Sequence, residues 1–112
     1  MVNYNESKIY KIISNCGDLV YVGSTTKKYL SSRLAQHKSK YKFYKKGTIT
    51  KSTSFQLFDA YEPENCEIIL IENVNCNTKN ELHARERYYI ETLNCVNKSL
   101  DLIPVLQESI II

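Results

Sequence analysis

Two short apolar runs separated by a turn open the chain and predict a β-hairpin. Residues 8–14 (KIYKIIS) and 19–24 (LVYVGS) are rich in the β-branched and aromatic residues typical of strands. The segment 15–18 between them contains Asn, Gly and Asp, which favour turns. Both faces of this hairpin carry apolar side chains, and such a sheet is usually covered on both sides. We therefore expect helices to flank it.

One further strand and three helices are predicted after the hairpin. Residues 66–74 (CEIILIENV) have a continuous apolar centre and predict a third strand. Residues 78–93 predict the clearest helix, because Thr78 and Glu81 form a capping box ahead of an apolar stripe. The two remaining helices are predicted from Thr25 or Thr26 to about Lys40, and at 54–60. The order β-β-α-α-β-α predicts an α/β (α+β) fold with a small sheet between helices.

The length of the chain predicts a single domain. With 112 residues it can form one core but has little room for a second module. We assign 1–112 to one domain, with a core at about 7–98 and a tail at 99–112. The end of this tail, 102–112, is apolar and contains Pro104, which suits either a closing strand or contact with a partner.

Neither a membrane span nor a secretion signal is indicated. No stretch approaches the ~20 apolar residues that cross a bilayer. The first residues carry charge and lack the apolar segment of a signal peptide. We therefore expect an intracellular protein, cytoplasmic or nuclear, without membrane contact.

The cysteines do not indicate a metal or disulfide site. None of the four forms a CxxC pair, and His37 and His83 complete no zinc pattern. Scattered thiols in an intracellular protein are usually buried small hydrophobes. We expect this of the four cysteines, which are Cys16, Cys66, Cys76 and Cys95.

Positive charge is concentrated in one segment of the chain. The net charge is +3, yet no Asp or Glu lies between Asp18 and Asp59, where nine Lys and Arg residues are interleaved with aromatic residues. Such a segment suits phosphate backbones, through charge neutralisation and counterion release. The alternative is a solvated, lysine-rich helix face. The residues that we expect to contact nucleic acid are Lys27, Lys28, Lys38, Lys40 and Lys42.

Two tyrosines of the hairpin are candidates for chemistry. With the predicted turn, Tyr10 lies opposite Gly23 and diagonal to Tyr21, and all three positions share one face. Gly23 has no side chain and leaves space beside Tyr10. The alternative is that both are core tyrosines whose hydroxyls are satisfied at the rim.

Arg33 and His37 lie four residues apart and share one face of the predicted helix. An arginine offers a planar fork of donors to a phosphate, and a histidine can donate or transfer a proton. The alternative is that His37 is a core or boundary histidine, because Leu30 and Leu34 lie on the same stripe.

Glu86 is the third candidate, because it falls on the apolar stripe of the last helix. Leu82 and Ile90, four residues before and after it, are both apolar. Glu81 has Arg85 as a partner four residues later, whereas Glu86 has no basic residue at such spacing. A buried carboxylate is costly without compensation. It is therefore expected either to form a tertiary salt bridge or to hold a hard cation such as Mg²⁺.

These residues together resemble the GIY-YIG nuclease superfamily. The matching elements are, in order, Lys8-Ile9-Tyr10, Tyr21-Val22-Gly23, the pair Arg33 and His37, Glu86, and Asn97. The resemblance spans roughly residues 7–98, and Lys8 replaces the first glycine of the family tripeptide. The separate DNA-recognition domain that many relatives carry has no counterpart here.

The resemblance implies a three-stranded, mainly antiparallel sheet flanked by helices. It also implies hydrolysis of DNA phosphodiester bonds with one divalent metal per site, Mg²⁺ or Mn²⁺. Glu86 would hold this metal, and Arg33 would grip the scissile phosphate.

The resemblance also implies roles for the remaining site residues. Tyr10 would orient or deprotonate the attacking water, with Tyr21 and His37 assisting proton transfer. Asn97 would help fix the geometry of the site. These roles agree with the chemistry, because a phosphodiester needs a cation, a nearby positive side chain and a poised water.

Three functional hypotheses follow from the sequence. The first is an active DNA endonuclease. The second is a weak or inactive nucleic-acid-binding module that needs a partner protein, although all the expected polar residues are present. The third, compatible with both, is a subunit whose tail at 102–112 docks onto a partner or a second copy of the chain.

Overall fold

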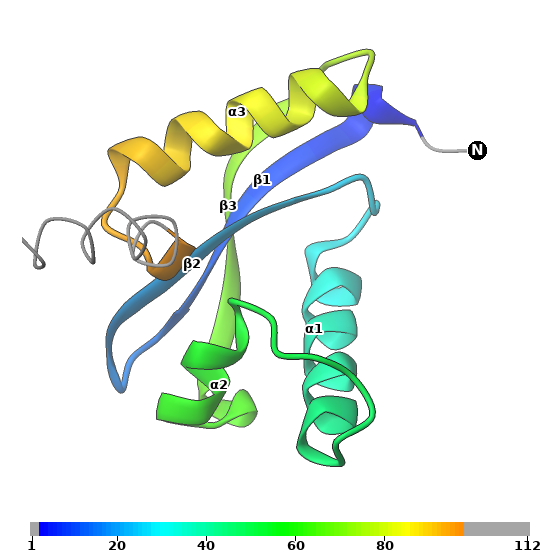
Figure 1. The fold of residues 1–112 in the computed structure, drawn as a ribbon. Helices are drawn as coiled ribbons and strands as arrows, with labels where there is room; N and C mark the ends of the chain where they lie inside the picture. Colours follow the sequence, from blue (N-terminus) through cyan, green and yellow to red (C-terminus); the bar gives the residue numbers. More distant parts are fainter. Residues whose placement is uncertain (1–2, 98–112) are drawn as a thin grey trace, which may run out of the picture.

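The computed structural model describes residues 3–97 and shows a three-stranded sheet with helices on both faces (Figure 1). The strands are β1 (Ser7–Ser14), β2 (Gly17–Thr25) and β3 (Cys66–Val74). The helices are α1 (Leu30–Lys45), α2 (Phe55–Tyr61) and α3 (Lys79–Thr92), with short 3₁₀ turns at Tyr4–Glu6 and Pro63–Asn65. The tail at 99–112 and its expected roles lie outside the described residues.

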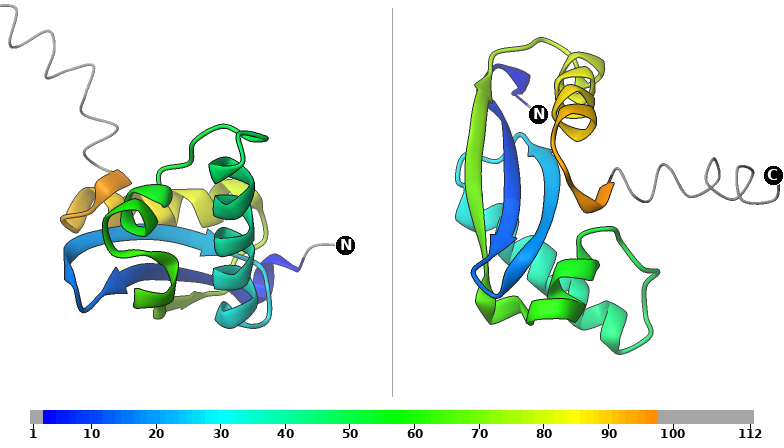
Figure 2. Two further views of the ribbon diagram at one scale, coloured as in Figure 1. Left: turned by 90° about the horizontal axis from the view of Figure 1, so that it is seen from below. Right: turned by 90° about the vertical axis from the view of Figure 1, so that its left-hand side faces the viewer.

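The sheet has the strand order β2-β1-β3, and β1 is antiparallel to both neighbours. The predicted α+β fold and the order β-β-α-α-β-α are therefore confirmed. Seen from below, α1 and α2 lie in front of the strands and α3 lies behind them (Figure 2). Because β1 is central, its side chains alternate between two apolar layers: Ile9 and Tyr10, adjacent in sequence, are both fully buried.

Two separate cores result from this arrangement. The core under α1 and α2 contains the aromatic residues of these helices and one face of the sheet. Its buried members include Tyr10, Ile12, Tyr41, Phe55, Leu57 and Phe58. The core under α3 is smaller, and its buried members are Ile9, Val22, Cys76, Leu82, Ile90 and Cys95.

The hairpin turn is tighter than predicted. β2 begins at Gly17, which pairs with Ser14 after a register shift. Tyr61 packs against this turn: a side chain at Gly17 would lie 2.1 Å from its hydroxyl, and that hydroxyl accepts a hydrogen bond from the Leu19 amide at 3.1 Å. Beyond the turn the predicted register is confirmed, because Tyr10 pairs with Gly23.

The first long helix begins later than predicted. Thr25 continues β2 and pairs with Lys8, so neither Thr25 nor Thr26 caps a helix. The Thr25 hydroxyl instead accepts a hydrogen bond from the Lys27 amide, which turns the chain before α1 starts. At its other end α1 runs past the predicted boundary at Lys40.

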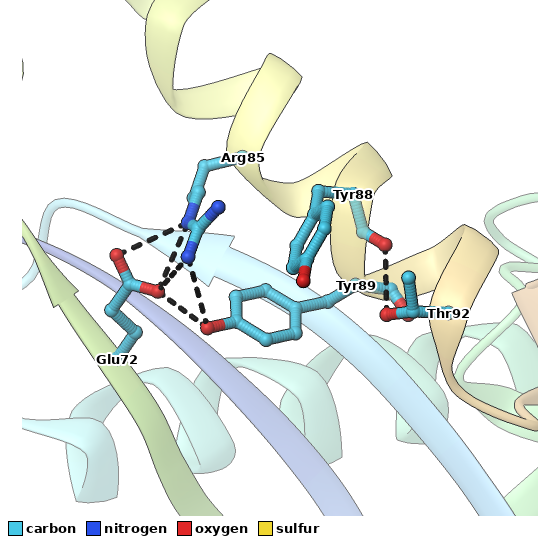
Figure 3. Close-up of polar contacts among 5 residues, drawn as sticks. All are labelled: Glu72, Arg85, Tyr88, Tyr89 and Thr92. Atoms are coloured by element: carbon cyan, nitrogen blue, oxygen red, sulfur yellow. Dashed lines mark hydrogen bonds and ion pairs between the residues drawn. The ribbon is translucent and has the colours of Figure 1, made fainter.

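The capping box of the last helix is confirmed, but one predicted ion pair is wrong. Glu81 accepts from the Thr78 amide while its own amide donates to the Thr78 hydroxyl. Its carboxylate therefore points back along the chain, and Arg85 pairs with Glu72 of β3 instead, at 2.7 Å. Tyr89 donates to the same carboxylate, which ties α3 to the edge strand (Figure 3).

The cysteines are free thiols, and three of them are buried as predicted. Cys16 is the exception, because it lies in the exposed hairpin turn. Within residues 3–97 no group of three or more His, Cys, Asp and Glu side chains is arranged to hold a metal ion.

Candidate active site

The candidate site is organised around the hydroxyl of Tyr10. This side chain is fully buried and projects beneath the backbone of Gly23 on the neighbouring strand. A Cβ atom at Gly23 would lie 2.5 Å from the Tyr10 hydroxyl and 2.6 Å from its ring. Glycine is therefore required at this position for Tyr10 to occupy its place.

Two side chains of α1 bind the same hydroxyl. Arg33 donates from Nε at 3.0 Å, and His37 Nε2 lies 2.7 Å away. The predicted sharing of one helix face by these residues is thus confirmed. Arg33 is held from its other side by Gln36, whose side-chain oxygen accepts from Nη1 at 2.6 Å.

A residue that the sequence did not reveal completes the environment of His37. Ser54 Oγ lies 3.1 Å from His37 Nδ1, and Ser54 is fully buried. Both ring nitrogens of His37 therefore have partners. Ser54 stands at the N-cap of α2, where serine usually binds a backbone amide, but its hydroxyl makes no capping bond here. In the sequence such a serine indicates only a helix start.

Burial controls the ionisation of these groups. It lowers the pKa of His37 to about 3, aided by the charges of Arg33 and Lys40, so the imidazole is neutral at physiological pH. Burial also raises the pKa of Tyr10, although the Arg33 charge and hydrogen bond oppose this. Burial raises the pKa of Tyr21 more strongly, and the nearby Tyr10 and Glu86 add to it. Both tyrosines are therefore protonated near neutral pH in the free protein.

Tyr21 lies beside this cluster as predicted. Its ring packs edge-on against His37, with centroids 5.5 Å apart, and its centroid lies 6.4 Å from that of Tyr10. The three rings exclude water from one side of the Tyr10 hydroxyl. Four predicted residues, Tyr10, Tyr21, Arg33 and His37, are thus brought together on one face of the sheet.

Glu86 approaches from α3, on the other face. It is half-buried and accepts a hydrogen bond from the hydroxyl of Ser24, the residue after Gly23. The expected lack of a basic partner on its own helix is confirmed. Within residues 3–97 it forms no ion pair either, so its compensation is a neutral hydroxyl. Its charge still raises the pKa of both site tyrosines, which shows that the carboxylate is near them.

Asn97 binds the outer edge of β2 rather than projecting into the site. Its Oδ1 accepts from the Val22 amide at 2.9 Å, and its Nδ2 donates to the Val22 carbonyl at 2.8 Å. These are the bonds that another strand would make to this edge. Asn97 therefore holds the segment between Tyr21 and Gly23 in place.

Three of the five lysines predicted to contact nucleic acid are on α1, and they lie on different sides of it. A helix turns about 100° per residue, so Lys40 lies on the flank of Arg33, whereas Lys38 and Lys42 lie on the opposite flank. Lys38 is near Cys66 of β3, where it opposes the rise that burial causes in the pKa of that thiol. Lys28 stands over the ring of Tyr29 at 5.5 Å. Lys27 lines a cleft together with Arg33.

The donor set suits one type of metal ion. One half-buried carboxylate, from Glu86, lies near the hydroxyls of Ser24 and the two site tyrosines. A structural zinc or calcium ion would need more protein ligands than this. Mg²⁺ keeps several waters and is often held by one or two carboxylates plus phosphate oxygens, so the residues fit such an ion.

The fold and site define a small α+β domain whose tyrosine, arginine, histidine and glutamate side chains converge beside a sheet edge. The family described as the GIY-YIG catalytic domain matches residues 6–99, and the chain belongs to this family. It is therefore a nuclease domain, whose substrate is nucleic acid. No curated protein and no solved structure matches the chain significantly. No helix within residues 3–97 combines the length and apolar character needed to cross a membrane.

Proposed function

We propose that this domain is a metal-dependent endonuclease that hydrolyses DNA phosphodiester bonds. The observation that carries the proposal is the Tyr10 hydroxyl, which contacts both Arg33 Nε and His37 Nε2 at hydrogen-bond distance. A buried tyrosine held by a cation and a neutral imidazole is placed to bind a water and move its proton.

Glu86 is the residue that would hold the divalent cation, Mg²⁺ or Mn²⁺. When bound, such an ion polarises the phosphate and neutralises the charge that develops on its oxygens. The Ser24 hydroxyl donates to the carboxylate and fixes its orientation. Ser24 thus acts as a positioning residue for the proposed ligand.

Arg33 is suited to hold the scissile phosphate. Its Nε and Nη1 are occupied by Tyr10 and Gln36, which fix the plane of the guanidinium group. Within residues 3–97 its Nη2 has no hydrogen-bond partner, so these donors remain for a phosphate oxygen. A preorganised charged donor of this kind stabilises negative charge in the transition state without reorganisation.

Tyr10 first releases its own hydroxyl proton to solvent and is then, as tyrosinate, the proposed acceptor of the water proton. The Arg33 N–H group stabilises this anion directly, and His37 contributes a second N–H if its proton is on Nε2. Tyr21 packs over the pair and excludes water from that side. Asn97 keeps the strand that carries Tyr21 and Gly23 in register through its two bonds to Val22.

A plasmid-nicking assay with Mg²⁺ or Mn²⁺ tests this proposal. We expect the wild type to nick and Glu86→Ala to lose activity by roughly 100-fold or more, because the ligand is removed. Glu67→Ala, which removes an exposed carboxylate of β3, is the matched control and should nick normally. Equal nicking by Glu86→Ala and wild type would refute the metal role.

The outcome for the wild type separates the two functions. Salt-sensitive DNA binding without nicking by any divalent ion would favour the alternative, a binding module that depends on a partner protein.

A further inference from the structure

An open cleft lies where the end of β2 meets the first turns of α1 and α3. Its volume is about 310 Å³. Ser24 and Lys27 line it from β2 and the following loop, Arg33 and Gln36 from α1, and Lys79 and His83 from α3. Lys79 and His83 lie outside the basic segment of the sequence, yet the fold brings them beside Lys27.

The cleft opens directly from the candidate active site, because two residues belong to both. Arg33 lines the cleft and donates to Tyr10, and Ser24 lines the cleft and donates to Glu86. A DNA strand with a phosphate bound to Arg33 would therefore continue either into this cleft or away from it along α1. The two directions differ in the charge of the side chains that the DNA would meet.

The cleft has the charge of an anion site. Lys27, Arg33 and Lys79 contribute three cations, and His83 adds a ring N–H. None of the residues that line it is acidic. In the other direction, along α1, Lys40 is the one lysine on the flank of Arg33, whereas Lys38 and Lys42 lie on the far flank. The positive charge next to the site is therefore concentrated in the cleft.

We propose that this cleft binds the nucleotide adjacent to the scissile phosphate, with Lys27, Lys79 and His83 holding its phosphate group. The proposal rests on the function proposed above and adds the direction that the DNA strand takes across the domain. The side chains suit a phosphodiester, since lysine acts as a flexible point charge and histidine as an N–H donor. Gln36 and the Thr26 hydroxyl supply neutral polar contacts to the sugar-phosphate backbone.

Two single substitutions, each of which removes one positive charge, test the proposal. Lys79→Gln removes a cation from the cleft, and Lys42→Gln removes an exposed cation from the far flank of α1. Neither should harm folding. Lys79 is the first residue of α3, where a positive charge is unfavourable to the helix dipole.

Binding of a fluorescein-labelled mixed-sequence duplex is measured by anisotropy over a range of salt concentrations, without divalent ions so that nothing is cut. We expect Lys79→Gln to bind several-fold more weakly and to reduce the slope of log K against log salt by about 0.9, as for one lost phosphate contact. We expect Lys42→Gln to match the wild type, because the structure places this residue, a contact expected from the sequence, on the flank of α1 that faces away from Arg33. His83→Gln should weaken binding in the same direction as Lys79→Gln.

Equal affinities and slopes for Lys79→Gln and Lys42→Gln would overturn the proposal. Because binding is measured without cleavage, this result is independent of nuclease activity. Nicking by the wild type with equal binding by both variants would leave the nuclease standing and refute the cleft. Failure to nick with selective weakening by Lys79→Gln would support the cleft and refute the enzyme.

Discussion

The Ser54 hydroxyl lies 3.1 Å from His37 Nδ1, in a region that solvent does not reach. Within residues 3–97 this nitrogen is the one hydrogen-bond partner of that hydroxyl. A buried O–H group that donates to nothing costs about 1–3 kcal/mol. The Tyr10 hydroxyl accepts from Arg33, so its own proton needs His37 Nε2 as acceptor, just as the Ser54 proton needs Nδ1. We infer that ionisation of Tyr10 resolves this competition: Ser54 then donates to Nδ1, and the imidazole proton on Nε2 is donated to the Tyr10 oxygen, 2.7 Å away. Arg33 and His37 would thus both stabilise a Tyr10 anion.

Ser54→Ala removes the donor that favours the His37 tautomer with its proton on Nε2, so we expect the balance of tautomers to change. Ser54→Thr is expected to keep this tautomer because the hydroxyl remains. The ¹⁵N shifts of the His37 ring report the tautomer, and a spectrum of His83→Gln assigns the two histidines. Nicking by Ser54→Ala should fall by up to about tenfold, since one hydrogen bond contributes about 1 kcal/mol. Unchanged ring shifts in Ser54→Ala would contradict the role given to this serine.

Gly23→Ala is predicted to damage the site far more than the fold. The new methyl group would lie 2.5 Å from the Tyr10 hydroxyl, so the ring must move away from Arg33 and His37. We expect a loss of about 1–3 kcal/mol in the free energy of unfolding and roughly a 100-fold loss of nicking. Urea denaturation and the nicking assay measure the two effects.

Gly47→Ala is the control for this substitution. Gly47 has a φ of +83° and nothing near its missing side chain, so alanine there costs about 1 kcal/mol through the backbone alone. It should keep full nicking activity. An active Gly23→Ala protein would show that Tyr10 is not held as the structure indicates.

His37 makes the stability of the domain depend on pH. Burial lowers its folded pKa to about 3, while the unfolded value is 6.5. Below pH 6.5 the unfolded chain binds a proton that the folded protein does not, so stability is lost as pH falls. The loss is roughly 1.4 kcal/mol per pH unit between these values.

Urea denaturation of the wild type and His37→Gln at pH 7 and pH 5 measures this contribution. We expect the wild type to lose more stability over this interval than His37→Gln, which has no imidazole to protonate. The exposed His83 provides the control, because His83→Gln should follow the wild type. Parallel pH curves for wild type and His37→Gln would contradict the burial of a neutral ring.

Asn97→Ala is predicted to loosen the exposed edge of β2. It removes two hydrogen bonds to Val22, each worth about 0.5–1.5 kcal/mol. The amide of Val22 should exchange with deuterium faster. Nicking should also fall, because Val22 lies between the site residues Tyr21 and Gly23. Asn94→Ala, at an exposed position three residues earlier, should leave the exchange rate unchanged. Protection of Val22 in Asn97→Ala would rule out the edge contact.

Local features of the sequence were sufficient to predict several elements of the fold correctly. The bounds predicted for the third strand are those observed, Cys66–Val74, because a continuous apolar run is bounded by polar turns. The capping box of Thr78 and Glu81 marked the start of α3 correctly. The pairing of Tyr10 with Gly23 was also predicted correctly, although the turn is shorter than predicted, because the register shift between Ile12 and Ser14 offsets the difference.

Other predictions failed where a tertiary contact outweighed a local preference. Thr25 could cap a helix, but pairing with Lys8 keeps it in β2. Arg85 could pair with Glu81 on its own helix, but the carboxylate of Glu72 on β3 lies opposite it and Glu81 serves the cap. Ser54 occupies a cap position, yet its hydroxyl binds His37.

The sequence by itself determined the family, the order of elements and the side chains that α1 and the hairpin bring together. These depend on periodicity and on contacts between neighbours in the chain. Only the tertiary structure decided that Glu86 binds Ser24 and that Lys79 and His83 join Lys27 around one cleft. Such relationships depend on how α3 is rotated and placed against the sheet. Packing across distant segments sets that orientation, and the apolar pattern of α3 alone does not specify it.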